Sequence, residues 1–227
     1  MFRKSAAIML ALGLCAKVMG EGTNFTVSVG RATLQLPIPE SFVEVGTKNR
    51  MIPMVPSNRL LAWFAMPEDM KHFDSEAAHE LKRHIQIQLL KESENRDFSA
   101  YEFATIASEL SKLQDESHAS AVQEINKILK KVGDPEKGGP PIRISEPKSL
   151  GTSFKSDNAM GFSMLMSFAT NEQGLRSAHP IACGAAVVRV KQKLLYVYVY
   201  SIVDGMDSID WVKTKSKSIA EAILKAN

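Results

Sequence analysis

The stretch LLYVYVYS, residues 194–201, decides the fold class of this 227-residue chain. Alternate side chains of a β-strand point to opposite faces, so the three tyrosines share one face and three aliphatic residues share the other. A strand with two apolar faces is usually covered on both sides. We therefore expect a sheet between two helical layers. The tyrosine face carries Tyr196, Tyr198 and Tyr200, and the aliphatic face carries Leu195, Val197 and Val199.

The sequence around this stretch predicts further strands joined by short links. The link near Lys191 predicts a hairpin between the tyrosine strand and the segment before it. Near the N-terminus, alternation of apolar and polar residues predicts another hairpin around Gly30 and Arg31. The expected strands are residues 142–153, 159–169, 180–190 and 194–203, with an N-terminal hairpin over 25–37 and a strand carrying Trp63 over 58–66.

Helical spacing of apolar residues predicts four helices. Residues 75–94 place Ala78, Leu81, Ile85 and Leu89 on one face, with spacings typical of an amphipathic helix. A second helix is expected over about 101–115, a third over 118–131 with Val122, Ile125 and Leu129 on one side, and a last one over 206–225 with Ile209, Val212, Ser216, Ile219 and Ile223 on one side.

Strands followed by helices and then by consecutive strands with short links indicate the α+β class. We expect one domain over residues 21–227, built as a mainly antiparallel sheet covered by helices on both faces, an α/β/α sandwich. The loop at 133–141, GDPEKGGPP, ends the helical middle of the chain.

Residues 1–20 have the features of a secretory signal peptide. Arg3 and Lys4 precede the uncharged run 6–16, which is shorter than the ~20 apolar residues needed to span a bilayer. We expect cleavage after Gly20, with Ala16 as the second choice, and therefore a periplasmic or secreted protein without a stable transmembrane segment. An uncleaved N-terminal anchor is the alternative.

Cleavage of residues 1–20 would change both the number of cysteines and the net charge of the chain. Lipidation at Cys15 is an alternative, although Leu14 stands where lipid attachment prefers a small residue. Loss of Cys15 leaves Cys183 alone in an apolar segment, where a buried, inert thiol is expected. The whole chain has a net charge of +3, but residues 1–20 contain three basic residues and no acid, so the mature chain is formally neutral.

One polar cluster offers metal-ligating side chains. His72, Glu76 and His79 are spaced so that a helix starting there would point all three one way, and histidine with carboxylate suits zinc. A solvated helix face is the alternative, because the string HELKRH lacks the H-E-x-x-H spacing. Methionines 160, 164 and 166 could bind copper, but they share one strand face with Phe162 and Phe168, which core packing explains.

Familiar catalytic and nucleic-acid patterns are absent from the sequence. It contains no G-x-S-x-G elbow, no P-loop and no dinucleotide-binding glycine motif. The basic stretches 189–193 and 213–217 have no interleaved aromatic residues, so we expect no nucleic-acid partner. The tyrosine face of 194–203 could stack on a small ligand, or it could pack as core with its hydroxyls partnered.

Two stretches resemble a known family. LPIPESFVEV followed by NRLLAWFAM, residues 36–45 and 58–66, resembles the start of secreted bacterial proteins of the PsbP-like fold group. The ending, KLLYVYVYS and then a helix closing on ILKAN, is similar to their last strand and C-terminal helix. The resemblance implies an antiparallel sheet between helices and carries over no catalytic residue, since fold does not fix function.

The sequence supports three functional hypotheses. The first is a non-enzymatic exported accessory protein that binds a partner protein or the cell envelope, without a cofactor. The second is a hydrolase or metal-dependent enzyme with a site at His72, Glu76 and His79. The third is a small-ligand binder that uses Tyr196, Tyr198 and Tyr200.

Overall fold

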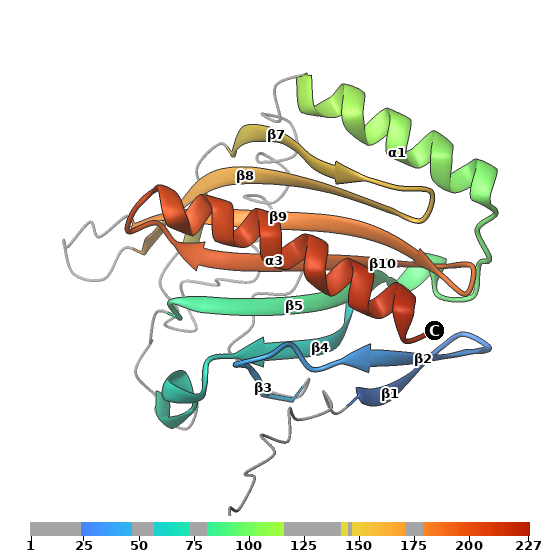
Figure 1. Ribbon diagram of the computed structural model, residues 1–227, viewed down its shortest axis with the longest axis horizontal. Helices are drawn as coiled ribbons and strands as arrows, with labels where there is room; N and C mark the ends of the chain where they lie inside the picture. Colours follow the sequence, from blue (N-terminus) through green and yellow to red (C-terminus); the bar gives the residue numbers. More distant parts are fainter. Residues whose placement is uncertain (1–23, 47–56, 73–80, 116–141, 145–146, 171–178) are drawn as a thin grey trace, which may run out of the picture.

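The computed structural model describes residues 24–46, 57–72, 81–115, 142–144, 147–170 and 179–227. These residues form a two-stranded hairpin, an eight-stranded antiparallel sheet and helices packed against it (Figure 1). The hairpin pairs β1 (Asn24–Val29) with β2 (Ala32–Pro37). The large sheet runs β3 (Val43–Glu44), β4 (Asn58–Ala65), β5 (Arg83–Leu90), β10 (Lys193–Ile202), β9 (His179–Val190) and β8 (Ala159–Thr170), and β8 pairs with both β6 (Ile142–Ile144) and β7 (Lys148–Lys155).

The strand order divides the large sheet into two halves. β3, β4 and β5 come from the first part of the chain, and the strands from β6 to β10 come from the last part. Among the described strands, the only pairing between the two halves is that of β5 with β10, with Ile85 opposite Val199 and Ile87 opposite Val197. The α+β class with a mainly antiparallel sheet is therefore confirmed.

Helix α3 (Met206–Lys225) covers the aliphatic face of the sheet (Figure 1). Its buried stripe includes the five positions expected from the sequence. The helix approaches β9 so closely at Gly184 that a Cβ atom there would lie 2.3 Å from the Val212 carbonyl oxygen. The core under α3 includes Phe64, Ile85, Ile87, Ala186, Val188, Leu195, Val197, Val199, Val212, Ile219 and Ile223.

Helix α1 (Ala100–Asp115) packs against one end of the opposite face. Phe103 and Ala107 of this helix contact a cluster that includes Met160 and Val187, with Tyr196 packed at its edge. Val187 lies directly opposite Tyr196 in the sheet, so this cluster belongs to the tyrosine face. Cover of the whole tyrosine face by helices stays a prediction.

Most elements near the two ends of the chain match the sequence-based expectations. The N-terminal hairpin, the strand with Trp63, and the strands at 159–169, 180–190 and 194–203 are confirmed, as are the helices at 101–115 and 206–225. Trp63 is 3% exposed and belongs to the core, as expected. The expected strand at 142–153 is instead two strands, β6 and β7.

The helix expected over residues 75–94 is wrong for its second half. Residues 83–90 form β5, a central strand, followed by the short 3-10 helix η2 (Lys91–Ser93). Ile85 and Leu89 lie four residues apart, which fits a helix, but Ile87 lies between them and shares their face in the strand. The helix expected over 118–131 and the signal peptide over 1–20 lie outside the described residues.

Candidate functional site

The tyrosine face brings together polar and aromatic side chains from neighbouring strands. Tyr198 of β10 lies opposite Gln86 of β5 on one side and Ala185 of β9 on the other. One register step further, Tyr200 lies between His84 and Cys183. The predicted sharing of one face by the tyrosines is thus confirmed. No sequence pattern indicated that β5 would place amides and an imidazole beside them.

On this face, the aromatic rings form one row and the side-chain amides form a second row beside it. The His84 and Tyr200 rings stack with centroids 4.6 Å apart, and Tyr198 follows Tyr200 at 6.3 Å. Beside them, Asn58 Nδ2 donates to Gln88 Oε1 over 2.8 Å, and Gln88 Nε2 donates to Gln86 Oε1 over 2.6 Å. These hydrogen bonds form an amide ladder through the buried side chains of Asn58, Gln88 and Gln86. The ladder provides hydrogen-bond partners for most of their polar atoms, which would be costly to bury without partners.

Three titratable groups of this face, His84, Cys183 and Tyr200, are held in their neutral forms. Burial lowers the pKa of His84 to about 4 and raises the pKa of the Cys183 thiol to about 12. Burial also raises the pKa of Tyr200 well above its ordinary value. Near neutral pH these three groups are therefore present as an imidazole, a thiol and a phenol, not as an imidazolium, a thiolate and a phenolate.

The residues predicted for a metal site are not brought together in the described part of the chain. His72 is the last residue of the 3-10 helix η1 (Pro67–His72), while Glu76 and His79 lie outside the described residues. Within the described ranges, no group of three or more His, Cys, Asp or Glu side chains is placed to hold a metal ion. The metal site at 72–79 therefore stays a prediction.

The methionines lie where strand alternation placed them. Met160, Met164 and Met166 of β8 are opposite Val187, Cys183 and Ile181 of β9, on the tyrosine face. Met160 is fully buried under α1, and Cys183 is buried with a free thiol. The expected core role is confirmed for Met160, whereas Met164 and Met166 are half-buried.

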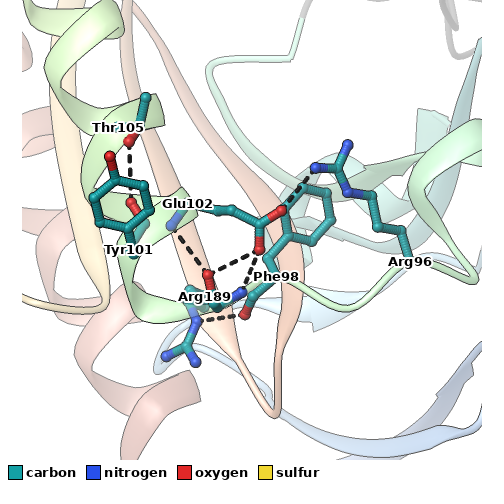
Figure 2. Close-up of polar contacts among 7 residues, drawn as sticks. Arg96, Phe98, Tyr101, Glu102, Thr105 and Arg189 are labelled. Carbon is teal, nitrogen blue, oxygen red and sulfur yellow. Dashed lines mark hydrogen bonds and ion pairs between the residues drawn. The ribbon is translucent and has the colours of Figure 1, made fainter.

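The start of α1 carries a dense polar network that is structural (Figure 2). Ser99 and Glu102 form a reciprocal cap, in which the Glu102 carboxylate accepts from the Ser99 amide over 2.8 Å and the Glu102 amide donates to Ser99 Oγ over 3.2 Å. Arg96 pairs with Glu102 over 2.8 Å. From β9, Arg189 Nε donates to the Phe98 carbonyl over 2.7 Å, which ties the helix start to the sheet.

A second surface, not expected from the sequence, lies along the flank of α3. The Arg83 guanidinium lies 4.3 Å from the Trp211 ring centroid, Trp211 stacks on Phe42 at 6.2 Å and 23°, and Lys215 Nζ lies 5.4 Å from the Phe42 centroid. We call these four residues the flank stack. They come from β5, α3 and the loop after β2, and each cation–ring contact stabilises the arrangement by ~0.5–1 kcal/mol.

The flank stack adjoins a shallow hollow of about 170 Å³ between α3 and the loop after β2. Lys215 lines both the stack and the hollow, and its Nζ donates to the Glu40 carbonyl over 3.3 Å. Trp211, Arg83 and Lys215 are all partly exposed. A signal was present in the sequence: Trp211 stands outside the apolar stripe of its helix, where a large aromatic is unusual.

Comparisons with known proteins give a fold-level similarity. No family model and no curated protein matches the chain. Among solved structures, cyanobacterial PsbP (CyanoP) from Synechocystis sp. PCC 6803 is similar at 11% identity, over 91% of this chain and 96% of that chain, with a TM-score of 0.39. A point mutant of protein Mog1 is 10% identical over 90% and 94% with a TM-score of 0.35. The Saccharomyces cerevisiae Ran-binding protein Mog1p is 11% identical over 90% and 90% with a TM-score of 0.28.

At these identities and TM-scores the similarities carry no conclusion about what this chain does. Its class rests on the strand pairing described above. Within the described residues, none of the helices combines the length and the apolar character that a membrane crossing requires.

Proposed function

We propose that this chain is an exported, non-enzymatic accessory protein that binds a partner protein. The flank stack is the observation that carries the proposal. Tryptophan and arginine are enriched among the residues that dominate binding energies at protein interfaces. Here both are partly exposed and already held by neighbouring rings and cations, so less side-chain entropy is lost on binding than for free side chains.

The chemistry of the tyrosine face supports binding over catalysis. His84, Cys183 and Tyr200 sit together, yet burial keeps each in its neutral form near neutral pH. A general base works best with a pKa near the operating pH, and a nucleophilic cysteine needs a lowered one. Neither condition is met by this cluster.

The experiment places a photo-activatable cross-linking residue at Ser218, which is exposed and lines the hollow next to the flank stack. The matched control carries it at Ser108, exposed on the outer side of α1. In the native envelope, we expect one discrete cross-linked protein from position 218, none from 108, and loss of the product in Trp211→Ala. Identical products at both positions, or turnover of a substrate by the purified protein, would contradict the proposal.

Export rests on the sequence of residues 1–20 and belongs to the proposal. Cleavage after Gly20 would free a chain whose first described strand begins at Asn24. Mass spectrometry of the protein from its native cells should give an N-terminus at Glu21. An intact N-terminus would favour the uncleaved anchor, and a lipid mass on Cys15 would favour the lipoprotein.

A second candidate is the binding of an uncharged small molecule on the tyrosine face. Two observations favour it: Tyr198 and Tyr200 are only partly buried, and His84 Nδ1 is buried without a hydrogen-bond partner in the described part of the chain. Saturation-transfer NMR with indole as probe tests it. We expect saturable binding that Tyr198→Ala weakens and Tyr101→Ala does not, and no saturable signal would remove the candidate.

The third candidate, a metal-dependent hydrolase at His72, Glu76 and His79, is tested by elemental analysis. Stoichiometric zinc lost in His79→Ala would support it. Absence of metal together with unchanged stability after chelation would remove it.

A further inference from the structure

We propose that the flank stack binds an acidic, extended segment of the partner protein, with two carboxylates on either side of an apolar residue. This inference rests on the proposed function and names the chemistry of the partner. It assigns the carboxylates to Arg83 and Lys215 and the apolar residue to the rings between them.

Arg83 and Lys215 are the two ends of the flank stack, and neither is neutralised by contact. Within the described ranges the ion pairs involve other cations, and none joins Arg83 or Lys215 to a carboxylate. Arg83 contacts the Trp211 ring, and Lys215 contacts the Phe42 ring and the Glu40 carbonyl. Both cations are therefore available to an added anion, and each is held in place by its ring.

Partial burial makes these cations better anion sites than ordinary surface lysines. Lys215 is partly buried against the Phe42 ring, and this burial lowers the pKa of its ammonium group. A charge pair in such a place is screened less than one in bulk solvent, where an exposed pair contributes only ~0–1 kcal/mol. A carboxylate on Lys215 would also restore solvation that burial has taken away.

The centre of the stack is apolar. Trp211 and Phe42 lie nearly parallel, and the hollow beside them includes Pro37, Pro39 and Ala222 in its lining. Phe42 is 7% exposed and belongs to the core, so the accessible ring is that of Trp211, which is partly exposed. An apolar side chain placed there covers the part of the Trp211 ring that is now in water, which favours binding by ~25 cal/mol per Å². The surface thus has the order cation, apolar centre, cation.

The spacing of the cations sets the length of the segment. The contacts along the stack measure 4.3, 6.2 and 5.4 Å. An extended chain advances ~3.3 Å per residue, so one segment can reach both cations with carboxylates no more than about five residues apart. An acid–x–apolar–x–acid pattern meets this limit.

Two acidic residues near the flank stack reduce its positive electrostatic potential. Glu40 lies near Lys215. The pKa of Asp204 is lowered mainly by the hydrogen bond from Ser208, and to a smaller extent by the positive charges of Arg83 and Lys82. Neither makes an ion pair with the stack cations in the described structure. Since Glu40 is exposed beside the binding position, its carboxylate would repel the proposed segment.

The probe is the capped peptide Asp-Ala-Leu-Ala-Asp, and the matched control peptide has both aspartates replaced by asparagine. Trp211 fluorescence follows the titration, because the other tryptophan, Trp63, is 3% exposed. We expect the aspartate peptide to bind at least tenfold more tightly than the asparagine peptide, and more weakly as salt is added.

Variants locate the binding. Arg83→Gln and Lys215→Gln should each weaken binding at least fivefold, and Glu40→Gln should tighten it at least twofold. The control is Lys217→Gln, because Lys217 is exposed on the same helix and lies 3.9 Å from Glu221. It should change affinity less than twofold. Thermal unfolding of each variant checks that the fold is kept.

Equal binding of the two peptides, an effect of Lys217→Gln as large as that of Lys215→Gln, or no saturable binding would overturn the inference. Failure of this inference can be distinguished from failure of the proposed function. A partner cross-linked at Ser218 while the acidic peptide does not bind overturns the acidic segment alone, whereas substrate turnover overturns the accessory role.

Discussion

His84 places an imidazole on a sheet face where the residues opposite it are Ala65 and Tyr200. Burial lowers its folded-state pKa to about 4, below the ordinary 6.5. As the pH falls from 6.5 to 4, the unfolded chain takes up the proton before the folded one does, so the stability of the fold decreases across this window. At pH 5 the loss is on the order of 2 kcal/mol, since one pKa unit corresponds to ~1.4 kcal/mol.

The substitution His84→Phe tests this, because phenylalanine can keep the stack on Tyr200. Urea unfolding at pH 7.5 and pH 5 should show the loss in the native protein and much less of it in the variant. At pH 7.5 the variant should be at least as stable, because it removes a buried nitrogen that has no partner in the described structure. Equal acid sensitivity of both proteins would contradict the assignment to His84.

A second prediction for a single residue concerns Gly184, where close packing against α3 leaves no room for a side chain. A Cβ atom at this position would lie 2.3 Å from the Val212 carbonyl oxygen, and backbone cannot move aside as a flexible side chain can. Gly184→Ser should therefore destabilise the protein by ~1–3 kcal/mol, measured by urea unfolding.

The control for Gly184→Ser is Gly205→Ser. Nothing lies within 4 Å of a Cβ atom at Gly205, whose backbone is extended and which precedes α3. Serine is favoured at this capping position, so the change should be neutral or slightly stabilising. Equal losses at both glycines would show that close packing of α3 is not the cause.

At the scale of elements, α1 depends on the cap at its start. Ser99→Ala removes the side-chain acceptor of the Glu102 amide and should cost ~1 kcal/mol. Hydrogen exchange of the α1 amides and urea unfolding measure the effect. Ser108→Ala, on the exposed side of the same helix, should stay within ~0.5 kcal/mol. Equal effects of the two serine variants would count against the cap.

The cap also makes the stability of the fold depend on pH. Hydrogen bonds from the Ser99 amide, from Arg96 and from the Ser99 hydroxyl lower the pKa of Glu102 to about 2, from an ordinary 4.5. A carboxylate with a lowered pKa stabilises the fold above its unfolded pKa, and this contribution is lost as the pH falls from 4.5 to 2. This window lies mostly below that of His84, so the two titrations can be separated.

The elements also show what sequence patterns can and cannot predict. The hairpins and α3 were predictable because their apolar residues repeat with one clear period. β5 was not, because its polar positions Gln86 and Gln88 are buried and paired through the amide ladder. A polar residue normally indicates an exposed face, and only the partner strands show that these glutamines are satisfied inside.

The flank stack was not predictable for a related reason. Its residues Phe42, Arg83 and Trp211 come from three separate parts of the chain, and no spacing within the sequence links them. The three tyrosines, in contrast, lie on one strand, so alternation alone placed them correctly on one face. Local order was predictable, and contacts between distant segments were not.

For the whole molecule, residues 1–20 should be dispensable for the fold. The described structure begins with β1 at Asn24, and the core under α3 is assembled from later strands. The protein produced as residues 21–227 should unfold at the same temperature as the full chain, within about 2 °C, which corresponds to less than ~1 kcal/mol for a protein of this size. Calorimetry measures both, and a clearly lower midpoint for the shorter protein would contradict the assignment of residues 1–20 to export.

Strand β7, which pairs with β8 alone among the described strands, has features that discourage pairing with another chain. β7 begins and ends with Lys148 and Lys155, its pairing with β8 has two irregularities, and Gly151 has a φ of 87°. Charges and bulges of this kind discourage edge-to-edge association.

The single junction between β5 and β10 has a consequence for the order of assembly. β9, β10 and α3 are neighbours in sequence and can form early, whereas β5 must wait for a strand made from a far later part of the chain. Contacts between such distant segments slow folding, because a long loop has to close before they form. Until that closure, β4 and β5 carry an unpaired apolar edge, so a chaperone that recognises exposed strands would bind this protein through its N-terminal half.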